Sequence, residues 1–453
     1  MYRFAVKRIL LPFGETLRGS RVLPRLRELE KSQWYSPERI RELQKKKLRR
    51  LVRHTYDHVP YYRRVFGERG LGPDDIVTVE DLTKLPILTK KEARKQYPDQ
   101  ISADNCRDRD YLRLHSSGST GEPFHFYLSK AGHDARLAAM FRYWRAAGYD
   151  FGEPWVRIGN HPHKATDRVS DRLLRCTYLQ LTEATETYLL ELLDQIRQAR
   201  PTIIRGYAPS LFLLASTARD HDFSEIRVKA TMSTGAMLYE HYRELVETQF
   251  HCPVYDVYGG EGMIIAGQFE CGSYHIHAEG VIVEFLNPDG TAAGPGELGS
   301  VVLTDLHNNA MPFFRYEIGD LGMASNEGCN CGRGLPVMGP PQGRDTDIIV
   351  TPDGTYIVDD YFDVLFRSAH VDQWQVIQHA LDRLEIKIVR GDLFSDADIA
   401  HIEQGIDADV GDQLEVALTF VDGIPATRSG KRRYVISDVA REHFSPSPGR
   451  ASE

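Results

Sequence analysis

One glycine-rich octapeptide carries the residue types needed to bind an anion. Residues 116–123 read Ser-Ser-Gly-Ser-Thr-Gly-Glu-Pro. The glycines let the backbone adopt positive φ and approach a ligand closely, and the hydroxyls and successive N–H groups can converge on a phosphate. No lysine follows the second glycine, as it does in the G-x-x-x-x-G-K-[ST] nucleotide loop. Taken alone, the segment predicts a phosphate-binding loop about as readily as a polar surface loop.

Three further motifs follow this loop in order along the chain. Residues 314–320 read Phe-Arg-Tyr-Glu-Ile-Gly-Asp, residues 343–347 read Gly-Arg-Asp-Thr-Asp, and residues 429–433 read Ser-Gly-Lys-Arg-Arg. An aspartate before Leu-Gly is usually a turn residue, and Ser-Gly-Lys near the end of a chain is usually a loop. Each motif is therefore weak by itself, and the ordered set is what favours catalysis.

Six cysteines point to thiol or metal chemistry rather than to disulfides, because no secretory signal is apparent. Cys329 and Cys331 lie one residue apart on a glycine-supported turn, and Cys271 is followed by His275 and His277. Three thiolates and one histidine form a tetrahedral set that suits structural zinc. The alternative is buried free cysteines with surface histidines. The remaining cysteines are Cys106, Cys176 and Cys252.

Composition indicates an ordinary soluble enzyme of two or three domains. The chain has 453 residues, of which 42% are hydrophobic and 26% charged. Its net charge of −8 argues against a dedicated nucleic-acid binder, which would normally be basic. No run of residues approaches the length of a membrane span, and no signal peptide is apparent, so we expect a cytoplasmic protein.

The first 21 residues form a basic amphipathic segment. Such a segment can lie on a membrane surface, or it can cover an apolar patch of its own protein. The second arrangement is the more common, so the sequence does not commit the protein to a membrane. The basic residues are Arg3, Lys7, Arg8, Arg18 and Arg21, and the apolar ones are Phe4, Val6, Ile9, Leu10, Leu11 and Phe13.

The order of expected elements indicates a layered α/β fold. Ser36 and Pro37 are typical of a helix start, with the basic run 45–50 on a solvated face. Strands at 111–114 and 124–128 flank the glycine loop, and a helix at 131–147 follows. Short strands at 202–204, 229–233 and 254–257 then alternate with helices. Ligands in such folds bind beyond the carboxyl ends of strands, and a β-rich region begins near residue 280.

From about residue 35 to 436, the chain resembles the phenylacetate–CoA ligase group of adenylate-forming enzymes. Within that group it is most similar to the branch of capsular-polysaccharide biosynthesis proteins. The resemblance implies a large N-terminal α/β domain of residues 1–343, with a zinc-bearing β subdomain at about 270–340. A hinge at 344–347 and a small, mobile α+β domain at 348–453 complete the implied fold. Besides the motifs above, the matching segments are 58–63, 85–90, 309–312 and 329–333.

The resemblance implies an ATP-dependent reaction in which a carboxylate attacks the α-phosphate, giving acyl-AMP and pyrophosphate. Glu261 then corresponds to the residue that helps hold Mg²⁺, and Asp320 to the carboxylate that accepts both ribose hydroxyls. Arg344 corresponds to a hinge-side arginine near ribose and phosphate. Lys431 corresponds to the lysine that reaches the reacting carboxylate and the α-phosphate. A compact cation on a long stem suits that last position.

The implied nucleotide site draws on two further groups of residues. The glycine loop would hold the β- and γ-phosphates through Ser116, Ser117, Gly118, Ser119, Thr120 and Gly121. The strand ends would contribute Gly235, Ala236, Tyr258, Gly259 and Gly260. For zinc, the His-Ile dipeptide of the family favours His275, with Cys271, Cys329 and Cys331 as the other ligands and His277 as the alternative histidine.

Two departures from the family pattern leave the function partly open. Glu122 stands where a lysine is common, which places an acid beside a triphosphate. Residues 351–355 form a plain turn where an Arg-Gly segment is associated with the second half-reaction. The acyl acceptor is therefore CoA or an amine, and an amide ligase acylating an amino sugar or amine in capsule or natural-product assembly is an alternative. A non-catalytic nucleotide-binding homologue is another.

The sequence leaves the acid and the oligomeric state unnamed. Segments 155–163 and 205–210 are expected to line the acid pocket, and they mix aromatic, polar and basic residues. The expected partners are ATP, a small carboxylic acid and a thiol or amine acceptor, with a homodimer left open.

Overall fold

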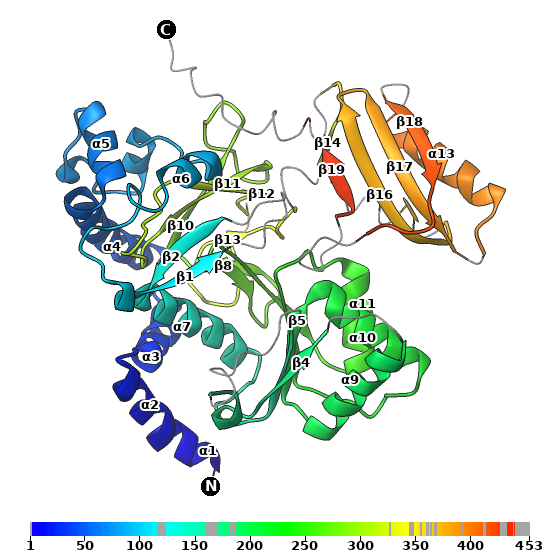
Figure 1. Ribbon diagram of the computed structural model, residues 1–453, viewed down its shortest axis with the longest axis horizontal. Coiled ribbons are helices and arrows are strands. Elements are labelled where there is room, and N and C mark those ends of the chain that lie inside the picture. The colour runs from blue at the N-terminus through cyan, green and yellow to red at the C-terminus, as the bar shows by residue number, and fades with distance from the viewer. Residues whose placement is uncertain are drawn as a thin grey trace. The chain divides into compact units, whose positions relative to one another are not determined.

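The computed structural model describes residues 2–115, 124–159, 170–181, 186–325, 328–343, 348–353, 356–358, 362, 365–366, 369–391, 393–410, 414–425, 433–437 and 439 (Figure 1). The chain divides into two compact units. Unit 1 comprises Met1–Val283, Val302–Ile318 and Ser325–Gly339, and unit 2 comprises Glu284–Val301, Gly319–Ala324 and Pro340–Glu453. The expected hinge at 344–347 lies outside the described residues and stays a prediction.

The centre of unit 1 is an eight-stranded sheet in the order β13-β9-β8-β7-β6-β5-β3-β4. Strands β4, β3, β5, β6 and β7 run parallel, and β8, β9 and β13 continue the sheet in antiparallel fashion. The bounds are β3 Trp155–Gly159, β4 Cys176–Gln180, β5 Ile203–Tyr207, β6 Ala230–Thr234, β7 Val254–Gly260, β8 Met263–Gln268, β9 Tyr274–Ile276 and β13 Val337–Met338.

Helices connect and cover the parallel strands, as parallel crossovers require. Helices α9 (Glu186–Ala199), α10 (Ala208–Asp220) and α11 (Glu240–Phe250) pack a leucine- and isoleucine-rich core against β3, β5 and β7. Figure 1 shows these green helices grouped beside β4 and β5. The three expected strands are confirmed. All three run further than the sequence indicated, and Gly206 in β5 and the glycines that end β7 still pair with neighbouring strands.

The expected hairpin and helix around the glycine loop are also present. Strands β1 (Tyr111–His115) and β2 (His125–Ser129) pair antiparallel, and α7 (Lys130–Ala146) follows directly. The Ser129 hydroxyl accepts a hydrogen bond of 3.0 Å from the backbone N–H of Gly132, which caps α7. Residues 116–123 themselves lie outside the described residues.

The N-terminal part of unit 1 is helical. The Ser36 side chain caps α4 by accepting a bond from Arg39 N at 3.4 Å, as expected. The expectation of a solvated basic run at 45–50 is wrong for Lys47, which is partly buried and donates to the carbonyl of Glu279. Burial lowers the pKa of Lys47 to about 8. The helices are α1 Tyr2–Ala5, η1 Val6–Leu10, α2 Leu11–Arg18, α3 Val22–Ser32, α4 Pro37–His58, α5 Pro60–Glu68, η2 Pro73–Asp75, η3 Glu80–Lys84, α6 Lys90–Gln96 and η4 Asp108–Asp110.

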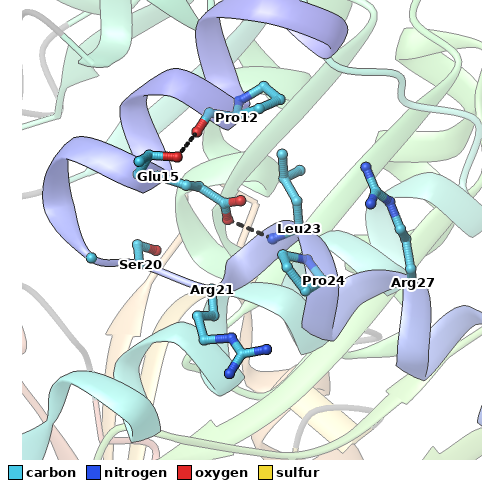
Figure 2. Close-up of a pocket in the computed structure, with 9 residues that line it drawn as sticks. Pro12, Glu15, Ser20, Arg21, Leu23, Pro24 and Arg27 are labelled. Carbon is cyan, nitrogen blue, oxygen red and sulfur yellow. Dashed lines mark hydrogen bonds between the residues drawn. The ribbon is translucent and has the colours of Figure 1, made fainter.

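The amphipathic segment turns its apolar side chains outward. Arg3 and Lys7 form ion pairs with Asp150, and Val6 is buried beside Gly152. On the other side Phe4, Ile9, Phe13 and Leu17 are 67%, 58%, 63% and 71% exposed. These four side chains therefore do not cover an apolar patch of the described chain. Covering such a patch was the arrangement that the sequence analysis named as the more common one. A hollow of about 490 Å³ lies between α2 and α3 (Figure 2).

Unit 2 is β-rich, with its own apolar core. Its four-stranded sheet has the order β18-β17-β16-β19 and packs against α13 (Asp396–Val410). A further sheet, β10-β11-β12, contains residues of both units. No described helix has the length and apolarity needed to cross a membrane. The strand bounds are β10 Val281–Leu286, β11 Gly299–Asp305, β12 Tyr316–Gly322, β14 Ile348–Val350, β15 Tyr356–Val358, β16 Val371–Ala380, β17 Arg383–Arg390, β18 Glu415–Phe420 and β19 Val435–Ser437.

Candidate active site and metal centre

The ends of β5, β6 and β7 form the edge at which the sequence places the nucleotide. Gly235 follows β6 with a φ of +71°, a conformation that favours glycine. A Cβ at this position would lie 2.7 Å from Cε1 of Tyr207, so the backbone rests directly on that ring. The Thr234 hydroxyl donates to the Val257 carbonyl at 3.0 Å, which ties β6 to β7. The edge therefore presents closely packed backbone, as a site for phosphate or ribose requires.

Glu261 occupies the tight turn between β7 and β8. Its φ is +43°, and Gly262 follows with a φ of +80°. A Cβ at Gly259 would lie 2.4 Å from the Met263 carbonyl oxygen, so the hairpin needs glycine there. Glu261 does not cap a helix, since the chain turns straight into β8. The turn places this carboxylate at the carboxyl end of the parallel strands.

Lys90 pairs with Glu261, and sequence reasoning missed this residue. The Lys90 Nζ lies 3.2 Å from Glu261 Oε1, with the two side chains 24% and 8% exposed. Thr89 caps α6 by accepting from Glu92 N at 3.2 Å, which fixes Lys90 at the first helical position. Leu88 N donates to Arg315 O at 2.9 Å and holds the segment in place. Lys90 belongs to segment 85–90, which was among the segments that resemble the family. Nothing in the sequence, however, linked Lys90 to Glu261.

The donor set at Glu261 fits a magnesium ion that is shared with phosphates. Mg²⁺ is usually held by one or two carboxylates, several waters and the phosphates of the substrate. Glu261 offers one carboxylate at the strand edge, and Lys90 adds a cation that can contact a phosphate oxygen. The ion pair thus offers one group of the kind that binds Mg²⁺ and one of the kind that contacts phosphate.

Several predicted site residues remain predictions. The glycine-loop residues 116–121, Arg344 and Lys431 lie outside the described residues. Asp320 belongs to β12 in unit 2, after Gly319 with a φ of +79°. Leu321 N donates to Gly343 O at 2.9 Å, so β12 beside Asp320 is tied to the chain just before the expected hinge.

The structure brings the four expected zinc ligands together. The ligand atoms of Cys271, His275, Cys329 and Cys331 all lie within 4.8 Å of one another. The Sγ atoms of Cys271 and Cys331 are each 3.5 Å from His275 Nε2. Zn–S and Zn–N bonds of about 2.3 and 2.0–2.1 Å at a tetrahedral angle separate sulfur from nitrogen by about 3.5 Å. The residues therefore have the spacing of a closed tetrahedral site.

The surroundings of His275 suit a metal ligand. Its Nδ1 lies 3.3 Å from the Leu335 carbonyl, so a proton on Nδ1 leaves Nε2 free to bind a metal. Burial lowers the pKa of His275, which favours the neutral ring. Strand β13 pairs with β9 at Val337 and His275, so the cysteine turn is already attached to the histidine strand.

His277, the alternative ligand, belongs to a different buried group. Its Nδ1 lies 3.1 Å from an Arg142 Nη2 and 3.3 Å from Glu279 Oε2. Arg142 and Glu279 form an ion pair of 2.8 Å, with each side chain 1% exposed. Burial lowers the pKa of His277. This ring stabilises a buried charge pair and is not part of the cysteine cluster.

Comparisons with known proteins relate the chain to CoA ligases and to CapK. Residues 349–438 match the family model described as the CapK C-terminal domain. The phenylacetate–coenzyme A ligase of Thermus thermophilus is 28% identical over 333 residues, covering 69% of this chain and 72% of that protein. Protein CapK of Staphylococcus aureus is 21% identical over 423 residues, covering 88% and 89%.

The fold agrees with that of a solved ligase as well. A 2-hydroxyisobutyryl-CoA ligase, crystallised in a post-adenylation state with an acyl-AMP, superposes with a TM-score of 0.72 at 18% identity. The superposition covers 88% of this chain and 90% of that one. The chain is thus similar in sequence to phenylacetate–coenzyme A ligases and to CapK, and similar in fold to a solved CoA ligase.

Proposed function

We propose that the protein is an AMP-forming ligase that activates a carboxylic acid with ATP and passes the acyl group to CoA. The observation that carries the proposal is the Lys90–Glu261 pair, 3.2 Å apart, at the carboxyl end of the parallel strands. It stands beside backbone that only glycine can form at Gly235 and Gly259. These are the features needed to bind a nucleotide triphosphate at the edge of the sheet.

In the first half-reaction an acid oxygen attacks the α-phosphorus, and pyrophosphate leaves. Negative charge builds on the phosphates, so oriented cations lower the barrier most. Lys90 is proposed to contact the phosphates, and Glu261 to orient Lys90 through their ion pair. The roles implied for residues 116–121, Asp320, Arg344 and Lys431 complete this proposal.

Two metals have separate proposed roles. Mg²⁺ at Glu261 would supply positive charge to the β- and γ-phosphates. Zinc at Cys271, His275, Cys329 and Cys331 would be structural, since four protein ligands leave no position for substrate.

In the second half-reaction the CoA thiol attacks the acyl carbon, and AMP leaves. Relatives named as CoA ligases favour this acceptor. An amine acceptor, which would give an amide, is the second candidate. The short turn after β14 favours it, because this turn stands where the phenylacetate ligases carry the Arg-Gly segment associated with the second step. A hinge at 344–347 would let one domain serve both steps.

The acceptor is tested by trapping. The protein is incubated with ATP, Mg²⁺ and a panel of acids, and then with CoA or with a panel of amines and amino sugars. Thioester formation supports CoA, whereas amide formation in preference to thioester would move the protein to the amide ligases. Hydroxylamine, which captures acyl-AMP directly, serves as the control for the first step.

A further inference from the structure

Two arginines lie side by side on the central sheet. Arg157 of β3 pairs with Arg205 of β5 in parallel register. Paired residues on neighbouring parallel strands point to the same face, about 5 Å apart. Like charges at such a spacing repel each other. The pair therefore needs compensation from another group.

A third arginine joins this pair, and the compensation within the described chain is small. Arg136 of α7 lies close enough to oppose the protonation of Arg205. Asp171 pairs with Arg157 at 3.0 Å, and no other described carboxylate pairs with any of the three arginines. The Nε atoms of Arg136 and Arg157 are buried and have no hydrogen-bond partner among described residues. Burial and the two neighbouring guanidinium groups lower the pKa of Arg205 to about 10.

The arginine cluster, Arg136, Arg157 and Arg205, lies next to the proposed nucleotide edge. Tyr207 is two residues beyond Arg205 on β5, so both side chains point to one face of the strand about 7 Å apart. The Tyr207 ring in turn supports the Gly235 backbone. An acid that reacts at the nucleotide edge and extends along this face reaches the cluster with its far end.

We propose that the acid activated by this enzyme carries a second anionic group, a carboxylate or a phosphate, which binds to the arginine cluster. The proposal rests on the adenylating function proposed above. Guanidinium groups form paired hydrogen bonds with both kinds of anion. Three guanidinium groups facing one carboxylate leave net positive charge for such a ligand to neutralise.

Binding without ATP provides the first test. Calorimetric titration compares a linear monocarboxylic acid with the dicarboxylic acid and the phosphorylated acid of the same chain length. At least one dianion should bind about tenfold or more tightly than the monoacid, a preference that high salt weakens. Equal binding of all three acids would overturn the proposal. Tighter binding of a dianion without pyrophosphate release would support the binding of a second anionic group and contradict adenylation instead.

Variants assign the effect to the arginines. Arg205→Met and Arg136→Met should each lower affinity for the preferred dianion by about 30-fold or more and leave the monoacid within a few-fold. Arg219→Met, on the exposed surface of α10, is the matched control. Because the described residues give the cluster a single carboxylate partner, Arg205→Met should also leave Tm unchanged or raise it. A lower Tm, with equal losses for both classes of acid, would mark the cluster as structural.

The outward face of α1 and α2 supports a second, independent inference. Residues 2–27 carry seven basic side chains and one acidic one, in a protein of net charge −8. Arg3 and Lys7 hold the segment to Asp150, which leaves Phe4, Ile9, Phe13 and Leu17 exposed. Arg21 and Arg27 line the hollow between α2 and α3 (Figure 2).

We infer that this face binds the surface of a bilayer containing anionic lipids. Exposed phenylalanine and leucine can enter the interface while neighbouring cations attract lipid phosphates. A two-fold dimer through this face would bring its basic side chains against their own copies, and like charges repel, so the charge of the face favours a bilayer over such a dimer.

Sedimentation of the full-length protein with vesicles tests this inference. Binding is expected to vesicles of phosphatidylcholine with phosphatidylglycerol, and not to phosphatidylcholine alone. Phe13→Ser with Leu17→Ser should weaken binding at least about tenfold, whereas Leu393→Ser, an equally exposed leucine in unit 2, should not. Arg8→Glu with Arg18→Glu should cost about fivefold or more per cation.

Two outcomes would overturn the membrane inference. One is that the parent protein does not bind the vesicles, or that all of these variants bind them equally well. The other is a parent protein that sediments as a dimer and becomes a monomer with Phe13→Ser and Leu17→Ser, which would assign the face to self-association.

Discussion

Removing one zinc ligand should loosen the turn that carries the two neighbouring cysteines. Cys331→Ser replaces a thiolate that lies 3.5 Å from His275 Nε2, while the backbone and the other three ligands remain. Without the metal, this turn keeps its two-residue pairing with β9 and the contacts of Arg333. Arg333 bonds to Gln33 Oε1 at 3.2 Å and Glu270 Oε2 at 3.0 Å, and its guanidinium lies over Phe269. The loss should therefore be partial rather than global.

The size of the effect follows from linkage between metal binding and folding. Free zinc at about a thousand times Kd stabilises the folded state by about 4 kcal/mol. At about 2–4 °C per kcal/mol for a domain of some 150–250 residues, Tm should fall by roughly 10 °C. We expect chelation of the parent protein to reproduce the same shift, and chelation of Cys331→Ser to add little.

The assay combines elemental analysis, thermal unfolding and hydrogen exchange. Protein purified without added metal should contain close to one equivalent of zinc, and exchange should increase at residues 271–276 and 328–338 in the variant. Cys106→Ser, a cysteine outside the cluster, is the matched control. Metal far below one equivalent, together with freely reactive thiols at Cys271, Cys329 and Cys331, would refute the reasoning.

Three further predictions concern catalysis and pH. Lys431→Ala should abolish acyl-adenylate formation and leave ATP affinity within a few-fold, because its contacts strengthen only as charge develops; a parental single-turnover rate would contradict this role. Glu261→Gln should lower kcat/KM for pyrophosphate release by about a hundredfold at unchanged Tm, and Lys90→Met should raise KM for ATP; parental kinetics in both would remove the pair from the site. Burial raises the pKa of Asp256 to about 6, so the folded state binds this proton more tightly than the unfolded state does. The stabilisation from the bound proton is therefore complete below about pH 4 and is lost as the pH rises through 6. In Asp256→Asn the side-chain oxygen can still accept a hydrogen bond from Tyr274. The free energy of unfolding of this variant, measured in urea, should therefore rise by up to about 3 kcal/mol relative to the parent between acid and neutral pH. A difference that does not depend on pH would contradict the assignment.

The sequence predicted those parts of the fold that depend on local patterns. Ser36 and Pro37 marked the start of α4, and the alternation of strands and helices predicted the parallel sheet. The clustering of Cys271, Cys329 and Cys331 with His275 was also predictable, because three thiols and a histidine in such a pattern favour one shared site, whereas the bound zinc stays a prediction. The prediction failed where glycines suggested the end of a strand, because β7 continues through Gly259 and Gly260 by pairing with β8.

Contacts between distant segments could not be predicted in this way. Lys90 and Glu261 are far apart in sequence, and only the fold brings their charges to 3.2 Å. Lys47 looked like one more exposed cation, yet it is partly buried and donates to the Glu279 carbonyl. The pairing of Arg157 with Arg205 likewise depends on strand register, which a single sequence does not encode locally.

The central claim is adenylation, and acid-dependent exchange of labelled pyrophosphate into ATP tests it most directly. The measurement needs no knowledge of the acyl acceptor and can be run with mono- and dianionic acids side by side. The account predicts exchange that requires both an acid and Mg²⁺, with AMP as the nucleotide product once an acceptor is added. Formation of ADP and phosphate, or nucleotide binding with no exchange for any acid, would contradict it.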